Sequence, residues 1–347
     1  MTHSYQPMVE LTRGRIVESI HYGAVAVVDV TGRLVASYGD PEIVTYLRST
    51  SKPFQALPFI ERDGDAYFKL TPREIALICA SHSGTDEHVA AVRGMQEKIG
   101  VVEGDLQCGA HYPYHEPTSE AMKARGEQPT PCRHNCSGKH TGMLAHARLR
   151  QLPIGNYLDT AHPVQESILQ AFADMTDVPA DKIELGTDGC SAPNFAVPLY
   201  NAALSFARLC DPVHLPAQRA AACRRITQSM MAHPDMVGGP GRFDTRLMEI
   251  GQGRIVAKGG AEGYQGIGLM PGALGADSPA LGIALKISDG DPNSRARPLA
   301  VLEVLHQLGA LQETQLTELA AFGPQTLKNW REIPVGVSRA AFKLEVA

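Results

Sequence analysis

The chain has 347 residues, 44% of them hydrophobic, and a formal net charge of −5. This length allows a large core, in one large domain or two modest ones. Acidic and basic residues are interspersed, and no basic stripe that could neutralise phosphates is present, so nucleic acid is not expected as a partner.

The distribution of apolar residues and cysteines points to a cytoplasmic protein. No run of 18 apolar residues is present, so we expect no membrane span. The first 14 residues contain no apolar stretch behind a positive segment, so we expect no signal peptide. The seven cysteines are odd in number and scattered, which indicates reduced thiols rather than a disulfide framework.

The first third of the chain predicts a hairpin, a strand and two helices. Residues 23–38 are two β-branched runs around a Thr-Gly turn, which is typical of a β-hairpin. Residues 48–53, RSTSKP, lead into a helix. The apolar residues before Ser81 predict a strand, and the spacing of apolar residues over 86–99 predicts a helix, with Ser83 as its cap.

The middle of the chain is predicted to be helical, and strands return late. Residues 105–131 form a long, proline-marked loop. Further helices are expected at 141–151, 163–175, 195–210, 216–232 and 297–309, and strands at 253–259, 265–270 and 280–288. We therefore expect a single α+β domain over residues 1–347, with a mixed or antiparallel sheet that takes strands from both chain ends.

A serine and a lysine at the predicted helix start could form a nucleophile and its base. Ser49 and Lys52 are three residues apart, which places them on one face of a helix. A serine hydroxyl needs a base to become nucleophilic, and the positive end of a helix favours the uncharged amine that such a base requires. The pattern is common by chance, and Ser51 is an ordinary N-cap candidate, so both interpretations stay open.

Two other segments could add to this chemistry. Lys258 follows a short apolar strand and precedes two glycines, a loose match to the K-T-G element of S-x-x-K serine hydrolases. It could equally be a solvent-facing strand lysine. Ser81 lies at the tip of the predicted strand, where backbone amides could bind an oxyanion. His82 is interpreted as a loop residue.

Two cysteine-bearing segments offer metal ligands. CRHNCSGKHTG at 132–142 contains thiols and imidazoles, which suit zinc, but it has no C-x-x-C pair, so a closed structural zinc site is not supported. A phosphate loop is excluded because Arg133 stands where a glycine is needed. In the second segment, 186–199, Asp188 could hold a substrate ammonium, and Cys190 could join Cys136. Each residue could also be an ordinary loop residue.

Taken together, these segments resemble the serine–lysine L-asparaginases of the rhizobial or class 3 type, the asparaginase II family. The shared motifs are RSTSKPFQ, ICASHSGTDEH, HNCSGKHTGML, GTDGCSAPNFAVPL, HPDMVGG and AKGGAEG, in this order over about residues 10–345. The resemblance implies a fold like that of serine β-lactamases and glutaminases, a homodimer, and hydrolysis of L-asparagine to L-aspartate and ammonia.

The resemblance also implies roles for individual residues. They are two serine–lysine pairs, Ser49 with Lys52 and Ser81 with Lys258; a zinc site made by Cys136, Lys139 and Cys190; and a substrate pocket lined by Arg48 and Asp188. One zinc ion per subunit would organise the site rather than activate the nucleophile. Because a lysine must lose its proton to bind metal, zinc occupancy and activity are expected to rise towards alkaline pH. Asp244 stands where some relatives carry a cysteine, so no role is transferred to it.

Rival interpretations lead to different measurements. A glutaminase or a β-lactamase-like hydrolase would act on another amide, and steady-state rates on asparagine, glutamine and a chromogenic β-lactam separate these enzymes. A non-catalytic scaffold would bind the amide or zinc and release no ammonia. The presence of both serine–lysine pairs favours an enzyme.

Overall fold

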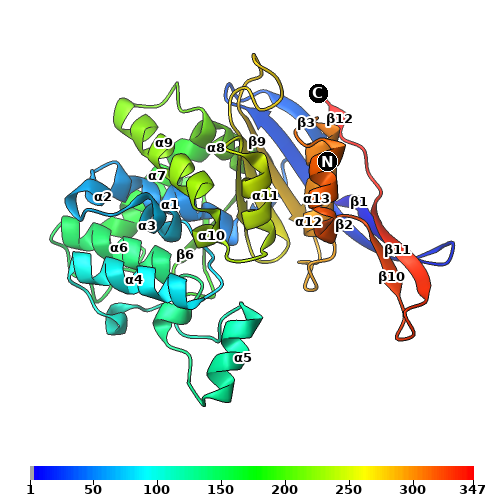
Figure 1. Ribbon diagram of the computed structural model, residues 1–347. Helices are drawn as coiled ribbons and strands as arrows, with labels where there is room; N and C mark the ends of the chain where they lie inside the picture. The colour runs from blue at the N-terminus through cyan, green and yellow to red at the C-terminus, as the bar shows by residue number, and fades with distance from the viewer. Residues whose placement is uncertain (1–3) are drawn as a thin grey trace. The chain divides into compact units, whose positions relative to one another are not determined.

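The computed structural model describes residues 4–347, which fall into two compact units (Figure 1). The first unit is built from the described residues up to Thr50, from Val197–Asp211 and from Ala257–Ala347. The second unit is built from Ser51–Ala196 and Pro212–Val256. Segments far apart in the sequence therefore come together within each unit.

The first unit carries the large sheet, and its strands come from both ends of the sequence. The strands of this sheet are β1 (Gln6–Arg13), β2 (Ile16–Asp29), β3 (Leu34–Tyr38), β7 (Ile255–Gly259), β8 (Tyr264–Leu269), β9 (Leu281–Ile287), β10 (Gln325–Lys328), β11 (Pro334–Ala340) and β12 (Glu345–Val346), and the short strand β4 (Val44–Tyr46) is not part of it. The helices are η1 (Arg48–Ser51), α8 (Leu199–Cys210), α12 (Arg297–Gln307), α13 (Glu313–Glu318) and η5 (Ala320–Phe322).

The sheet order is β10-β11-β1-β2-β9-β8-β7, with β3 paired to β2 and β12 paired to β3. The central pair, β2 and β9, is antiparallel and runs from Gly23 opposite Ile287 to Asp29 opposite Leu281. The predicted hairpin is confirmed as β2 and β3, and its turn is held by the Asp29 carboxylate, which accepts hydrogen bonds from the Thr31 amide at 2.9 Å and the Arg33 amide at 3.1 Å.

Both faces of the central strands are covered. Every residue of β9 is buried, although alternate side chains point to opposite faces. Helix α8 packs against one face so closely that a Cβ at Gly282 would lie 1.7 Å from the Ala203 carbonyl oxygen, and α12 lies over the other face (Figure 1). The expected α+β class, with an antiparallel sheet drawn from both chain ends, is confirmed.

The second unit is mainly helical, as predicted for the middle of the chain. Its helices are α1 (Lys52–Ile60), α2 (Gly64–Tyr67), α3 (Pro72–Ile78), α4 (Asp86–Ile99), η2 (Glu103–Asp105), α5 (Glu116–Ala124), η3 (Pro131–Arg133), α6 (Ser137–Leu149), α7 (Pro163–Thr176), η4 (Ala180–Lys182), α9 (Ala217–Ala232), α10 (Pro234–Val237) and α11 (Phe243–Gly251), and the strands β5 (Glu184–Thr187) and β6 (Pro193–Pro198) pair as an antiparallel hairpin.

Helix α1 forms the centre of this unit. All nine of its residues are buried, and it packs against α6, α7 and α9. Phe54 of α1 makes an edge contact with Phe172 of α7 at a centroid distance of 6.0 Å, and Phe172 stacks on Phe195 of β6 at 4.7 Å. A polar side chain on α1 is therefore held away from water by apolar neighbours.

Several predicted elements differ from the structure, among them the predicted loop at 105–131, which contains the helix α5. The apolar run before Ser81 is the helix α3 rather than a strand, because Thr71 and Glu74 form a capping box that starts it. The helix predicted from residue 195 begins only at Leu199, after the strand β6 and Pro198. The cap of α4 is Thr85 rather than Ser83, whose hydroxyl donates instead to the Gly238 carbonyl at 2.7 Å.

Among residues 4–347, no helix is both long enough and apolar enough to cross a membrane.

Candidate active site

Lys52, the first residue of α1, is a buried lysine at the junction of two helices. Its side chain is 1% exposed, and its Nζ atom donates to the Ala80 carbonyl at 2.5 Å and to the Ser81 hydroxyl at 3.0 Å. Ala80 and Ser81 follow Cys79, the residue that caps the C-terminal end of α3. Lys52 and Ser81 are 29 positions apart. The three-residue spacing that paired Lys52 with Ser49 therefore did not predict this contact.

Ser49 and Arg48 belong to the first unit and lie in the 3₁₀ helix η1. Ser49 is half-buried. Arg48 has a left-handed backbone with φ 53°, and its Nη1 atom lies 3.8 Å from Oε1 of Glu262. The pairing of Ser49 with Lys52 and the contact of Arg48 with substrate stay predictions.

Lys258 also belongs to the first unit, on the strand β7 that the sequence predicted. It is fully buried, and its Nζ atom donates to the Gly259 carbonyl at 2.6 Å. The interpretation as a solvent-facing lysine is therefore wrong, and its pairing with Ser81 stays a prediction. Asp244 is half-buried in the first turn of α11.

Two backbone amides around Ser81 already have acceptors within the protein, and the oxyanion site suggested by the sequence stays a prediction. The Ser81 amide donates to the Val237 carbonyl at 3.0 Å, so a protein acceptor already occupies it. The Gly84 amide donates to Nδ1 of His82 at 3.2 Å. These bonds fix the loop that carries Ser81 and use up two of its donors.

His82 is a buried connection between this loop and α6, not simply a loop residue. Its Nε2 atom lies 2.9 Å from the Ser137 hydroxyl, which itself donates to the Cys132 carbonyl at 3.0 Å. The hydroxyl therefore accepts from His82, and the ring carries its proton on Nε2. Burial first, and the nearby positive charges second, hold the pKa of His82 well below its ordinary value. Apart from its position between two serines, no feature of the sequence indicated this role for His82.

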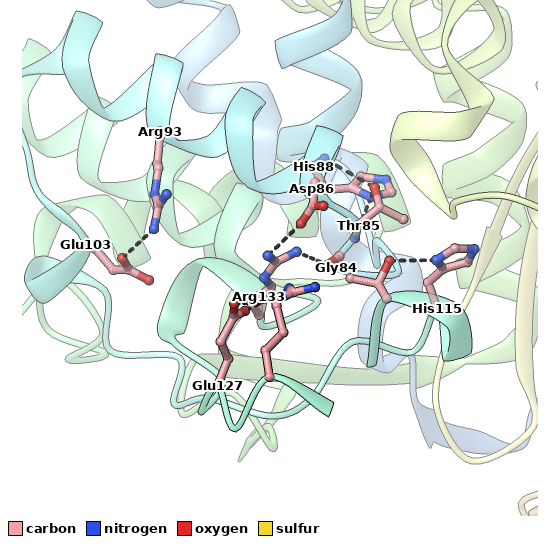
Figure 2. Close-up of polar contacts among 11 residues, drawn as sticks. Gly84, Thr85, Asp86, His88, Arg93, Glu103, His115, Glu127 and Arg133 are labelled. Carbon is pink, nitrogen blue, oxygen red and sulfur yellow. Dashed lines mark hydrogen bonds and ion pairs between the residues drawn. The ribbon is translucent and has the colours of Figure 1, made fainter. Parts of the chain in front are cut away.

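The side chain of Arg133 also holds this loop, through contacts with Gly84 and Asp86 (Figure 2). Its guanidinium donates to the Gly84 carbonyl at 2.9 Å and pairs with the Asp86 carboxylate at 2.6 Å. Gly84 has φ 71°, and a Cβ there would lie 2.7 Å from the Arg133 carbonyl oxygen, so the two backbones approach too closely for a larger residue. The next residue, Thr85, caps α4 by accepting from the His88 amide.

A cluster of metal-binding groups lies at the start of α6. The sulfurs of Cys136 and Cys190 and a carboxylate oxygen of Asp188 all lie within 4.8 Å of one another. Lys139, one turn into α6, donates from Nζ to the Cys190 sulfur at 2.9 Å. Cys190 and Asp188 lie in the turn between β5 and β6, which is closed by the Asp188 amide donating to the Ala192 carbonyl at 2.9 Å.

The electrostatics of the cluster favour a thiolate at Cys136. A hydrogen bond from the Cys190 thiol is the main cause that holds the pKa of Cys136 well below its ordinary value, while burial opposes it. The positive charges of Lys52 and Lys139 lower it further. The same hydrogen bond and burial raise the pKa of Cys190. Burial disfavours the charged form of Lys139, but the two thiols outweigh it, so its pKa is raised.

Two thiols, an amine and a carboxylate are a donor set that suits zinc, provided that Lys139 loses its proton. The other thiol and imidazoles of this segment make separate contacts, and Nδ1 of His140 lies 2.7 Å from the Tyr157 hydroxyl while its Nε2 atom has no hydrogen-bond partner within residues 4–347. Cys132 donates weakly to Gln96, and burial raises its pKa to about 12. Nδ1 of His134 accepts from the Cys136 amide at 3.0 Å. The structure thus gathers the three predicted ligands and adds Asp188, which was predicted to line the substrate pocket.

Comparison with known proteins identifies one family over nearly the whole chain. The family described as L-asparaginase II matches residues 9–340. A search of curated proteins found no match.

Similar solved structures include a probable glutaminase from Bacillus subtilis complexed with 6-diazo-5-oxo-L-norleucine, which is 14% identical, with 82% of this chain and 84% of that chain covered and a TM-score of 0.37. A β-lactamase from Mycobacterium bovis is 13% identical, with 85% of this chain and 94% of that chain covered and a TM-score of 0.37. At this degree of similarity the two structures say nothing of the activity of this chain.

Proposed function

The chain belongs to the L-asparaginase II family and is an amidohydrolase, and we propose that it hydrolyses the side-chain amide of L-asparagine to L-aspartate and ammonia. The family match over residues 9–340 carries this proposal. The buried contact between the Lys52 amine and the Ser81 hydroxyl supports a serine–lysine mechanism, because a lysine beside a serine can take the hydroxyl proton.

In the proposed mechanism, a serine attacks the amide carbon and an acyl-enzyme forms. Ser49 is the preferred nucleophile, with Lys52 as the base that takes its proton and passes it to the leaving ammonia. Ser81 is the second candidate, with Lys52 or Lys258 as its base. Water then cleaves the acyl-enzyme. Arg48 is proposed to bind the substrate carboxylate, because a guanidinium matches its two oxygens.

We propose that Cys136, Lys139 and Cys190 hold one zinc ion per subunit. The gathered thiols and the buried amine support this set. When bound, the ion would supply a positive charge that organises the site and positions substrate. Asp188 is within reach of the same cluster, so its carboxylate could either complete the metal site or bind the substrate ammonium. We also propose that residues 1–347 act as one domain, in a homodimer, in the cytoplasm.

The test is an ammonia-release assay on the full chain with zinc supplied. The parent protein should release ammonia from asparagine faster than from glutamine, and should not open a chromogenic β-lactam. Faster release from glutamine would replace the proposed substrate, and no release from any amide would remove the enzyme assignment.

Serine variants identify the nucleophile. Ser49→Ala should lose at least 10³-fold in kcat, on the order expected when a covalent nucleophile is removed. Ser81→Ala should keep more activity, and loss in Ser81→Ala with retention in Ser49→Ala would reverse the assignment. Ser167→Ala is a matched control, because that hydroxyl donates only within its own helix, to the Val164 carbonyl at 2.8 Å.

A further inference from the structure

The motif HPDMVGG, residues 233–239, lies against the loop that contacts the Lys52 amine, and the mechanism above gives this motif no role. It forms the short helix α10 and ends in two glycines, and α10 packs against α3, α9 and α11. The loop contributes the Ala80 carbonyl and the Ser81 hydroxyl, which accept hydrogen bonds from Nζ of Lys52 at 2.5 Å and 3.0 Å. Any contact that fixes this loop therefore also fixes the proposed base.

Two hydrogen bonds join the loop directly to the turn at 233–239. The Ser81 amide donates to the Val237 carbonyl at 3.0 Å, and the Ser83 hydroxyl donates to the Gly238 carbonyl at 2.7 Å. Gly239 has φ 117°, and a Cβ there would lie 2.5 Å from Oγ of Ser83. Only a glycine at this position lets the turn approach the loop so closely.

His88 makes a third connection, from the first turn of α4. Its Nδ1 atom accepts a hydrogen bond from the Thr85 amide at 3.2 Å, so this nitrogen carries no proton (Figure 2). Nε2 therefore carries the ring proton and donates it to the Asp235 carbonyl at 3.0 Å. A capping box usually has Glu or Gln at this position, which reaches back to the N-cap amide. The imidazole reaches both that amide and the turn.

The turn is itself fixed by α11. The Thr245 hydroxyl donates to the Pro234 carbonyl at 3.1 Å, and the Gly238 amide donates to the same carbonyl at 3.1 Å. The Arg242 amide donates to the Gly239 carbonyl at 3.3 Å. Thr245 is 2% exposed, so water does not compete for its hydrogen bond. The carbonyls that the turn offers to the loop and to His88 are therefore held in place from the opposite side.

We propose that His88 and the turn at 233–239 position the reacting groups, by holding the loop so that the Lys52 amine meets the attacking serine. This inference rests on the proposed function, in which Lys52 is the base. His88 is a positioning residue, because it acts through the loop. A displacement of about 1 Å at a reacting group can cost about 100-fold in rate, so a small movement of this loop is enough to lower kcat.

Variants of His88 separate the two contacts of its ring. His88→Glu keeps an acceptor for the Thr85 amide but loses the donor to the Asp235 carbonyl, whereas His88→Gln offers both groups. In ammonia release from asparagine by the full chain, we expect His88→Glu to lower kcat by about 10–100-fold with KM nearly unchanged. His88→Gln should recover most of this loss. Ser83→Ala is a smaller change that removes the bond to Gly238, and it should lower kcat in the same direction.

His162 provides a matched control within the same unit. It is 3% exposed, its Nδ1 atom accepts from the Val164 amide at 3.2 Å at the start of α7, and its Nε2 atom lies 3.0 Å from the Pro153 carbonyl. His162→Glu should therefore lower the melting temperature about as much as His88→Glu does, but should keep the kcat of the parent. Circular dichroism verifies that every variant is folded at the assay temperature.

Amide hydrogen exchange measured by mass spectrometry tests the loop without catalysis. Residues 80–88 should exchange about fivefold faster in His88→Glu and in Ser83→Ala, the factor expected when one hydrogen bond is lost. His162→Glu should leave the exchange of this segment unchanged.

Two outcomes would overturn the proposal. Equal kcat values for His88→Glu and His162→Glu would reduce His88 to an ordinary structural residue. Exchange at the parent rate over residues 80–88 in both His88→Glu and Ser83→Ala would show that the turn does not hold the loop. A parent protein that releases no ammonia would remove the proposed function and with it the role in the reaction, while the exchange rates would still decide whether the turn holds the loop.

Discussion

Replacing Gly138 with alanine should push the start of α6 away from α3. A Cβ at Gly138 would lie 2.2 Å from the carbonyl oxygen of Leu77 and 2.9 Å from its carbonyl carbon. Since non-bonded heavy atoms prefer roughly 3.5 Å, the two backbones must separate by about 1 Å. Overpacking of this kind costs about 1–3 kcal/mol, and the upper end applies because the obstacle is backbone rather than a side chain that can rotate.

The net loss of stability is smaller than the overpacking cost, because alanine favours the helix more than glycine does. Alanine gains about 1 kcal/mol over glycine in a helix, so the net loss should be about 2 kcal/mol. For a unit of this size, that loss corresponds to a fall in melting temperature of roughly 4–8 °C. Ammonia release should fall even at temperatures where Gly138→Ala stays folded, because Lys139 is the next residue and the displacement moves its amine relative to Cys190.

Thermal unfolding followed by circular dichroism, together with ammonia release and metal content, tests this prediction. Gly142→Ala should lose less stability than Gly138→Ala, because its new Cβ would meet a side-chain methyl of Ile78 at 2.6 Å rather than backbone. Gly104→Ala should be neutral or slightly stabilising, because nothing lies within 4 Å of its Cβ. If Gly138→Ala melted at the same temperature as Gly104→Ala, the close packing of α6 on α3 would be refuted.

Three further predictions concern other parts of the chain. In urea unfolding, Arg133→Met should lose about 1–2 kcal/mol of unfolding free energy, because it removes a partly buried charged donor. Asp86→Asn should lose under about 0.5 kcal/mol, because the Asp86 side chain is 81% exposed. Equal losses would show that the hydrogen bond from Arg133 to the loop does not stabilise the fold. Burial lowers the pKa of His146 from 6.5 to about 3, so below pH 6.5 the unfolded chain binds a proton that the folded chain does not. Between pH 6.5 and 5.5 the parent should therefore lose about 1 kcal/mol of unfolding free energy that His146→Leu does not lose. Parallel profiles of unfolding free energy against pH would contradict this. Trp330, the single tryptophan, is fully exposed between β10 and β11. If a homodimer forms through these strands, tryptophan emission should shift to shorter wavelength when light scattering reports a doubled mass. A doubled mass without this shift would place the interface elsewhere.

Local chemistry allowed several elements to be predicted from the sequence. The helix at 86–99 agrees with α4, because apolar spacing sets its face and Gly100, in the left-handed region, ends it. The hairpin of β2 and β3 follows from two β-branched runs around a turn. Where an apolar run suits both a strand and a helix, as before Ser81, the nearby capping box was the deciding signal, and the prediction missed it.

The sequence by itself determined the α+β class, the helical middle and, through the order of its motifs, the family. Only the tertiary structure decided which side chains meet. The contact of Lys52 with Ser81, the approach of Cys190 to Lys139, and the chain from Gln107 through Tyr157 to His140 each join residues far apart in sequence. Spacing rules act over one or two turns of a helix, whereas these contacts depend on how α1, α3, α6 and the β5–β6 hairpin bury their apolar faces against one another.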